Sequence, residues 1–428
     1  MLPKNYIHTW LIEKTKLLSE VDGLVESEAN KLDRAEFYLV NGRVLTPHRV
    51  ISPGGVRVKG DSIGRVFAMS PGEIPEGVET IDVQGAWIIP GIIDMHLHGG
   101  GGADCMDGDP EAIRTIARAH AQGGTTAILP TTLTSSTGDM RLALEAVQTA
   151  MEEDVDGARI LGIHLEGPYF AYEQRGAQDP RYLKTPDPRE YLEIIDKYPS
   201  IKRVSAAPEL PGALDLGREL RKRGILAAIG HTDATYDQAL AALEAGYSHM
   251  THLYSGMSGV KRVNCYRVAG AIESGLLLDE LSVEVIADGK HLPGSLLKLI
   301  YKCKGAEGIA LCSDALRPTG LPEGNYLTGS QEDGQEIIVE DGVAWLKDRS
   351  AFAGSVVRGT QMIKTMVEVA GIPLQDAVKM ATSTPARIVH LADKTGSLDQ
   401  GKLADLTVMR DDFTVVKTIV GGKIVYSL

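Results

Sequence analysis

Eight short β-type runs alternate with helical stretches through the middle of the chain, and this alternation limits the fold more than any other feature. The strand candidates are 88–95, 125–131, 158–165, 202–208, 225–231, 249–254, 282–288 and 308–314. Helical stretches, with apolar residues at spacings of three and four, are expected at 110–121, 137–153, 212–223, 235–245 and 293–302. The pattern is typical of parallel βα units. We predict an α/β fold, a (β/α)8 TIM-type barrel with its active site at the carboxyl ends of the strands.

A doubly wound open sheet is the rival architecture for such an alternation. It would be expected to carry a Gly-rich phosphate-binding turn that follows its first strand and opens a helix. The run GGGGAD at 99–104 follows the first expected strand but lacks the start of a helix behind it. This absence favours the barrel.

Two further β-type segments flank the alternating part, at 35–87 and 396–428, and both are punctuated by glycine. We predict that they form one small β-sandwich domain built from both termini. The barrel then spans 88–395. Residues 1–34 carry apolar residues at near-helical spacing among many Glu and Lys, which predicts a helical N-terminal extension.

Polar side chains gather at the ends of the expected strands. His96 and His98 are two residues apart, so in a strand both imidazoles point to one face. Four other polar residues end later strands: Glu166, His231, His252 and Asp314. Imidazole and carboxylate oxygen are ligands of Zn²⁺, Fe²⁺ and Mn²⁺. A hydrogen-bonded core residue explains any one of them, but all six at strand ends predict a metal site.

The composition and net charge of the chain limit the classes of molecule that it can bind. The net charge of −13 is spread along the chain, so we expect neither nucleic acid nor an anionic membrane as a partner. An anionic substrate would then need a few local cations. The four cysteines show no CxxC pairing, and no apolar run approaches the roughly 20 residues of a membrane span. We expect a soluble cytoplasmic protein.

From about residue 35 to its end the sequence resembles the amidohydrolase superfamily, and within it the family of N-acetylglucosamine-6-phosphate deacetylases. The resemblance is carried by PGIIDMHLHGG, PTTLTSS, LEGPYF followed by RGAQ, GHTDATYDQALAALEAG, THLYSGM, VIADGKH, SDA, FAGS, and ATSTPAR followed by GSLDQGKLADLTVM. It implies a barrel with a β domain from both termini, a homodimer, and hydrolysis of the acetamido group of an amino-sugar phosphate.

The resemblance also implies roles for the residues at the strand ends. Glu166, His231 and His252 match the ligands of the main metal, and Asp314 matches the catalytic carboxylate. His96 and His98 match a second-metal pair that only some members keep. One or two divalent ions per subunit are therefore expected. We expect Zn²⁺, with Fe²⁺ or Mn²⁺ as alternatives.

Further matches suggest substrate contacts. His291 matches the family's sugar-contacting histidine, and Ala177 lies in the loop that covers the sugar. Gln178 stands where many members have a histidine that polarises the substrate carbonyl, and glutamine still donates a neutral hydrogen bond. The segment bordering the sugar is matched by Phe352, Ala353 and Gly354.

The sequence departs from the family after the sixth strand. Ser255 and Gly256 replace an Asn-Ala pair, and the family's phosphate-binding arginine, which commonly reaches in from the partner subunit, falls at 263–264, where this chain has valine and asparagine. Nearby cations could replace it, or could form a solvated basic loop: Lys261, Arg262 and Arg267. An arginine fork suits phosphate, and we expect Arg262 to make the contact.

Other functions stay open at this point. The enzyme could act on another N-acetylhexosamine, of the galactosamine type or without phosphate. A cyclic-amide hydrolase is disfavoured by Glu166, which stands where such enzymes need a carboxylated lysine. A barrel that had lost its chemistry would lack ligands or the aspartate, and none is missing from this sequence.

Overall fold

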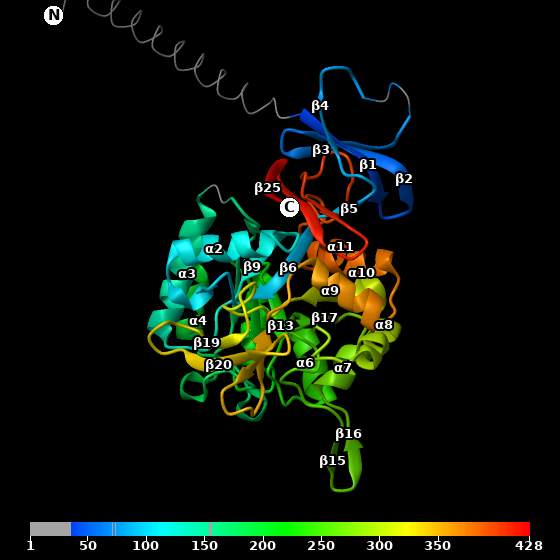
Figure 1. The fold of residues 1–428 in the computed structure, drawn as a ribbon. Helices are drawn as coiled ribbons and strands as arrows, with labels where there is room; N and C mark the ends of the chain where they lie inside the picture. Colours follow the sequence, from blue (N-terminus) through cyan, green and yellow to red (C-terminus); the bar gives the residue numbers. More distant parts are fainter. Residues whose placement is uncertain (1–35, 71, 73, 154–155) are drawn as a thin grey trace, which may run out of the picture.

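The computed structural model describes residues 36–428 except residues 71, 73, 154 and 155 (Figure 1). The helical extension predicted for residues 1–34 lies outside these residues. A β sheet at one end of the molecule adjoins a larger body in which helices surround parallel strands (Figure 1). No helix among the described residues is both long and apolar enough to cross a membrane.

Parallel strands form the centre of the larger body, in two sheets. One sheet has the order β11-β12-β13-β14-β17-β18 and the other the order β10-β9-β6. Their strands are β6 (Ile92–Leu97), β9 (Thr125–Pro130), β10 (Arg159–Ile160), β11 (Ile163–Glu166), β12 (Ile201–Ala206), β13 (Leu226–Ile229), β14 (Tyr247–Met250), β17 (Ser282–Ile286) and β18 (Ile309–Cys312). Parallel bridges between Thr131 and His164 and between Leu97 and Ala315 connect the two sheets at both edges.

Helices follow most of these strands along the chain and cover them. They are α2 (Pro110–Ala121), α3 (Thr137–Met151), α4 (Pro188–Lys197), α5 (Ala213–Lys222), α6 (Tyr236–Ala245), α7 (Ala271–Leu277), α8 (Gly294–Gly308), α9 (Thr360–Lys364), α10 (Leu374–Ala381) and α11 (Ser383–Ile388). The helices expected from apolar spacing are confirmed as α2, α3, α5, α6 and α8. The parallel α/β class is confirmed as well.

Both ends of the described chain meet in one mixed sheet, the terminal sheet, of order β25-β24-β23-β5-β1-β2-β3 with β4 beside β1. Its strands are β1 (Glu36–Leu45), β2 (Val50–Lys59), β3 (Ser62–Ala68), β4 (Glu79–Asp82), β5 (Trp87–Pro90), β23 (Leu406–Met409), β24 (Val415–Val420) and β25 (Lys423–Ser427). Its own apolar core includes Leu39, Val56, Ile88, Leu406 and Ile419. The pairing of β5 with β23 joins segments more than 300 residues apart.

The first expected strand, 88–95, is wrong as a single element. It divides at Gly91 into β5, which pairs with β1 and β23, and β6, which pairs with β9. A Cβ atom on Gly91 would lie 2.1 Å from Oγ1 of Thr126, so the close approach of the strands requires glycine here. The chain thus passes directly from the terminal sheet into the parallel strands.

Three antiparallel elements were not predicted, and the smallest is the pair β7 (Gly99–Gly100) and β8 (Ala103–Asp104). The sheet β19-β20-β21-β22 follows β18 and consists of β19 (Gly324–Thr328), β20 (Gln335–Glu340), β21 (Val343–Leu346) and β22 (Phe352–Ser355). The hairpin β15 (Lys261–Val263) and β16 (Tyr266–Val268) projects from the body at the end opposite the terminal sheet (Figure 1).

Candidate metal centre and active site

All six polar residues expected at strand ends lie at the carboxyl ends of the parallel strands. His96 lies in β6 and His98 just beyond it, and Glu166 ends β11. The others follow β13, β14 and β18: His231, His252 and Asp314. All but His96 line a cavity of about 200 Å³, and His96 is fully buried beneath it. His231, His252 and Asp314 have φ values of 45°, 27° and 49°, and such strain at residues other than glycine is concentrated at functional sites.

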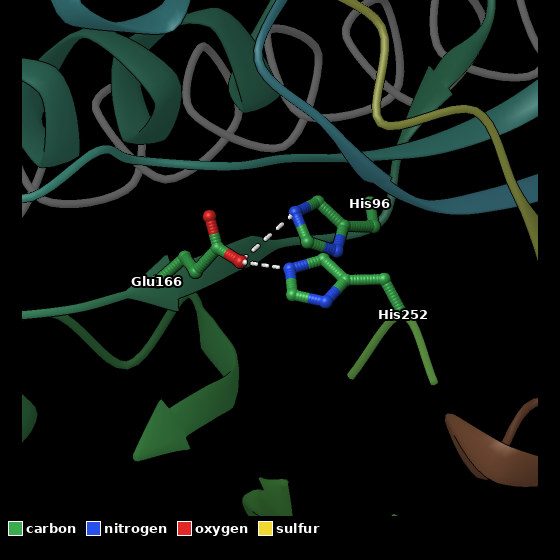
Figure 2. A group of neighbouring side chains, drawn as sticks. All are labelled: His96, Glu166 and His252. Atoms are coloured by element: carbon green, nitrogen blue, oxygen red, sulfur yellow. Dashed lines mark hydrogen bonds and ion pairs between the residues drawn. The ribbon is translucent and has the colours of Figure 1, made fainter. Parts of the chain in front are cut away.

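Glu166 lies between histidines from different strands. Its Oε1 atom lies 3.3 Å from His96 Nε2, 3.1 Å from His252 Nε2 and 3.6 Å from His231 Nε2. Figure 2 shows His96 and His252 with their rings turned toward this carboxylate oxygen. Three histidines from three other strands therefore point a ring nitrogen at one carboxylate oxygen of Glu166.

A second group shares His96. The Nε2 atoms of His96 and His98 are 3.3 Å apart, and Asp314 Oδ1 lies 3.5 Å and 3.1 Å from them. Glu166 contributes to this group too, with Oε2 3.3 Å from His98 Nε2. Glu166 is thus the carboxylate common to both groups.

The spacing of these atoms fits divalent metal. Zinc–ligand bonds of about 2.0–2.1 Å in a tetrahedron separate the ligand atoms by roughly 3.3 Å. The separations above fall near this value, and the donor set of imidazole and carboxylate suits Zn²⁺, Fe²⁺ and Mn²⁺. The groups His96–Glu166–His252 and His96–His98–Asp314 each keep their ligand atoms within 4.8 Å of one another.

Backbone carbonyls orient two of the histidine rings. Nδ1 of His98 lies 3.2 Å from the carbonyl oxygen of Thr131, and Nδ1 of His231 lies 2.9 Å from that of Gln174. Because a carbonyl only accepts, Nδ1 carries the hydrogen in both rings and Nε2 is left as the ligand atom. Nδ1 of His252 has no hydrogen-bond partner among the described residues.

The electrostatics of the cluster favour ionised carboxylates. Burial disfavours the charge on Asp314, but the hydrogen bond from His98 and the charges of His96, His98 and His252 lower the pKa of Asp314 below its ordinary value. Burial disfavours the charged ring of His98, but the hydrogen bonds and charges of Asp314 and Glu166 outweigh it and raise the pKa of His98 to about 9. The buried carboxylates thus favour positive charge at the strand ends, which the histidines supply here and a bound cation would supply in their place.

The residues expected to contact substrate line the same cavity, with two exceptions. The lining includes His291, Ala177, Gln178, Ser255, Gly256, Phe352, Ala353 and Gly354. Nδ1 of His291 lies 2.7 Å from Asp288 Oδ2, and the His291 ring packs 4.9 Å from that of Phe352. Gln178 accepts from the Thr134 backbone N–H at 2.8 Å and donates to Glu166 Oε2 at 3.0 Å. These two side chains are therefore fixed in place.

The exceptions are Arg262 and Arg267, which lie opposite each other on β15 and β16 and not in the lining. The residues described around the cavity include no lysine or arginine. Lys261 is paired with Asp233. Within the chain as described, the cavity lacks the cation that a phosphate group requires.

Sequence reasoning missed two buried charges beneath the cavity. Glu284 on β17 accepts hydrogen bonds from Arg203 on β12 at 2.6 and 2.8 Å and lies 2.7 Å from His96 Nδ1. All three side chains are fully buried. The sequence did carry a signal, because a glutamate in the run SVEVI and an arginine in IKRVSA interrupt otherwise buried strands.

Comparison with known proteins agrees with this geometry. The model of the amidohydrolase family matches residues 87–425. An N-acetylglucosamine-6-phosphate deacetylase of Vibrio furnissii is 33% identical over 86% of this chain and 90% of its own. An N-acetylgalactosamine-6-phosphate deacetylase of Escherichia coli O157:H7 is 31% identical over 84% of this chain and 92% of its own. The crystal structure of the N-acetylglucosamine-6-phosphate deacetylase of Pasteurella multocida superposes with a TM-score of 0.85, at 28% identity, over 92% of this chain and all of that one. The chain belongs to the amidohydrolase family.

Proposed function

We propose that this protein is a metal-dependent deacetylase that hydrolyses N-acetylglucosamine-6-phosphate to glucosamine-6-phosphate and acetate. Three histidines and two carboxylates that line one cavity, with His96 buried beneath them, carry the proposal. Relatives named as deacetylases of amino-sugar phosphates, matched over most of their length, supply the substrate class.

Five residues would hold the metal. Glu166, His231 and His252 are the proposed ligands of the main ion, and His96 and His98 those of a second. We expect Zn²⁺, with Fe²⁺ or Mn²⁺ as alternatives, and one or two ions per subunit. A bound divalent ion would supply Lewis acidity and lower the pKa of water at the site.

Asp314 is the proposed general base and acid. Its carboxylate lies among the proposed metal ligands, takes the proton of the attacking water and returns it to the departing amine. The amine is a poor leaving group until it is protonated, so this return is needed for the C–N bond to break. The Oδ1 atom of Asp314 lies 3.1 Å from His98 Nε2, which would place the carboxylate beside an ion held by the His96–His98 pair.

The rest of the lining would bind the sugar. His291, oriented by Asp288, is the proposed contact to sugar hydroxyls, and Phe352, Ala353 and Gly354 border the ring. One amide hydrogen of Gln178 is used by Glu166, and the second can donate to the acyl oxygen. Ala177, Ser255 and Gly256 complete this wall.

We further propose that a cationic side chain of a neighbouring subunit binds the phosphate group of the substrate. The described lining contains no lysine or arginine, whereas Arg262 and Arg267 stand on a hairpin that projects from the body (Figure 1). In a homodimer such a hairpin could bring Arg262 into the neighbouring subunit's cavity.

The finer architecture forms part of the same proposal. The bridges at both edges of the two parallel sheets support a closed (β/α)8 barrel over residues 88–395. A small β-sandwich domain would comprise residues 35–87 and 396–428. We expect this enzyme in the cytoplasm.

Acetate release tests the proposal. The purified chain would be assayed on N-acetylglucosamine-6-phosphate, its galactosamine epimer, and N-acetylglucosamine without phosphate, before and after chelation. We expect the glucosamine phosphate to react best, chelation to abolish release, and added Zn²⁺ to restore it. Release from none of the three, or release insensitive to chelation, would contradict the proposal. Preference for the epimer would favour the second candidate, which rests on the relative of that name.

A further inference from the structure

One buried carboxylate touches the metal site from below, on the side away from the cavity. Glu284 Oε1 lies 2.7 Å from His96 Nδ1 and accepts from the backbone N–H of His252 at 3.1 Å. A single side chain on β17 therefore contacts the ring of one proposed ligand and the main chain of another. Neither Glu284 nor its partner Arg203 reaches the cavity lining.

Arg203 fixes this carboxylate. Its two terminal nitrogens donate to the two oxygens of Glu284 at 2.6 and 2.8 Å, and also to the carbonyl of Met95 at 3.3 Å and to Thr251 Oγ1 at 2.9 Å. The guanidinium thus ties β12 to β6, to the end of β14 and to β17. Because the guanidinium makes these four hydrogen bonds, it is fixed in place, and its two bonds to Glu284 fix the orientation of that carboxylate.

Burying the Arg203–Glu284 ion pair has a free-energy cost. Both side chains are fully buried, and taking two charges out of water costs several kcal/mol per ion, which their attraction only partly offsets. In proteins generally, replacing a buried ion pair with well-packed apolar residues of the same volume is often neutral or stabilising. The presence of this pair beneath the metal site therefore points to a use other than stability.

The use follows from the chemistry of imidazole. Glu284, already bonded to Arg203, can only accept, so His96 Nδ1 carries the hydrogen and Nε2 offers its lone pair to the cavity. His98 and His231 are oriented by neutral carbonyls, whereas His96 is oriented by a carboxylate, which makes the ring a stronger ligand. His164 packs edge-on 4.6 Å from the His96 ring and limits its rotation.

His96 is the ligand that the two groups of metal-binding atoms share. We propose that Glu284, clamped by Arg203, is a positioning residue that holds His96 Nε2 toward the cavity and so sets the affinity of the ion bound through the His96–His98 pair. A third group of possible ligands, His96, Glu284 and Cys312, lies on the other side of the ring. Arg203 occupies both oxygens of Glu284 there, which excludes a cation.

Metal binding to the apoprotein, without substrate, tests this inference. Glu284→Gln leaves Arg203 buried without its charge partner and can fail to fold. The main variant therefore replaces both members, Arg203→Met with Glu284→Met. Zn²⁺ affinity and stoichiometry are measured by competition with a chromophoric chelator, and thermal melting checks folding. His249→Gln is the matched control, because His249 approaches Glu284 Oε2 at 3.5 Å but contacts none of the proposed ligand rings.

We expect two binding steps in the wild type, with one weakened about 10- to 100-fold by the double replacement and neither changed by the control. In a His96→Ala background the double replacement should cause no further loss, because its effect passes through His96. Unchanged binding in the first variant, or an equal loss in both backgrounds, would overturn the inference.

The inference rests on the proposed metal site and not on the substrate. Because the binding experiment contains no sugar, a failure of the acetate assay would leave its result standing. If the wild type releases acetate but the Arg203–Glu284 replacement leaves metal binding unchanged, the inference is refuted and the proposed function stands.

Discussion

At the scale of the residue, Asp314, the proposed general base, has an unusual backbone conformation. Its backbone lies in the left-handed region, with φ 49°, which turns the side chain toward His98 immediately after β18. A residue other than glycine adopts this conformation only where its surroundings enforce it. The bridge between Leu97 and Ala315 fixes the next residue and so enforces the turn.

Asp314→Asn should therefore lower kcat about 100- to 10,000-fold, because the amide keeps the shape but cannot accept the proton. Metal content, measured by elemental analysis, should stay at the wild-type level, since the proposed ligands are intact. A variant within about threefold of wild-type kcat would exclude the role of Asp314.

The residues that could be predicted from the sequence are those whose side chain can bind a metal and which stand at the end of an expected strand. His96, His98, Glu166, His231, His252 and Asp314 end strands, and the structure brings them together. Glu284 and Arg203 were missed because a charge inside a strand gives no hint of its partner. The two residues are 81 positions apart in the sequence and meet only when β12 and β17 lie in the same sheet. No local sequence pattern predicts such a contact.

At the scale of the element, the junction of β5 and β6 is the most constrained point. Gly91→Ala would place a methyl group 2.1 Å from Oγ1 and 2.5 Å from Cγ2 of Thr126, a buried, β-branched side chain with little freedom to move. We expect a loss of about 1–3 kcal/mol in the free energy of unfolding, measured with urea, and lower metal affinity.

Gly138→Ala is the control for this prediction. Gly138 lies in the first turn of α3, where a Cβ atom would meet only Ser136 Oγ at 3.6 Å. Alanine is favoured over glycine in a helix by up to about 1 kcal/mol, so stability should hold or rise. Equal behaviour of the two variants would show that the junction is not tightly packed.

The β15–β16 hairpin is the element on which the phosphate proposal depends. Arg262→Ala should lower kcat/KM for the phosphorylated sugar about 10- to 150-fold, the value of one charge-assisted hydrogen bond, and hardly change it for the unphosphorylated sugar. Arg267→Ala, its cross-strand neighbour, is the comparison. If neither replacement changes the preference, the hairpin does not bind phosphate.

Elements with helical or strand periodicity were predicted well, and the antiparallel sheet β19–β22 was not. Its strands are short, and β20, QEIIVE, has three consecutive branched residues and no regular alternation of polar and apolar positions. The Asp341–Gly342 pair that follows is a strong hairpin signal, and φ is positive at both residues. Placing that hairpin beside the cavity still requires the tertiary structure.

For the molecule as a whole, buried neutral histidines predict sensitivity to acid. Burial, together with the nearby charge of Arg358, lowers the pKa of His120 from 6.5 to about 4 against the opposing effect of the Gly99 carbonyl. The unfolded chain binds this proton below about pH 6.5 and the folded chain only below about pH 4, so stability is lost as the pH falls through that window.

His120→Gln should remove this dependence while keeping a donor for the Gly99 carbonyl, which lies 3.0 Å from His120 Nε2. We expect the wild type to lose roughly 2 kcal/mol more than the variant between pH 7 and pH 5, by urea unfolding at both values. His48→Gln, at an exposed position, should behave as wild type. Parallel losses in the wild type and in His120→Gln would contradict the prediction.

The terminal sheet also sets the order of events during synthesis. β5 is held between β1 and β23, and it continues through Gly91 into the strand that carries His96. The N–H of Gly91 donates to the carbonyl of Asp405, more than 300 residues later in the chain. Because a ribosome delivers the N-terminal part first, β6 lacks this anchor until residues 405–409 have been synthesised. His96, a proposed metal ligand on β6, is therefore held in its final position only after β23 has joined the terminal sheet.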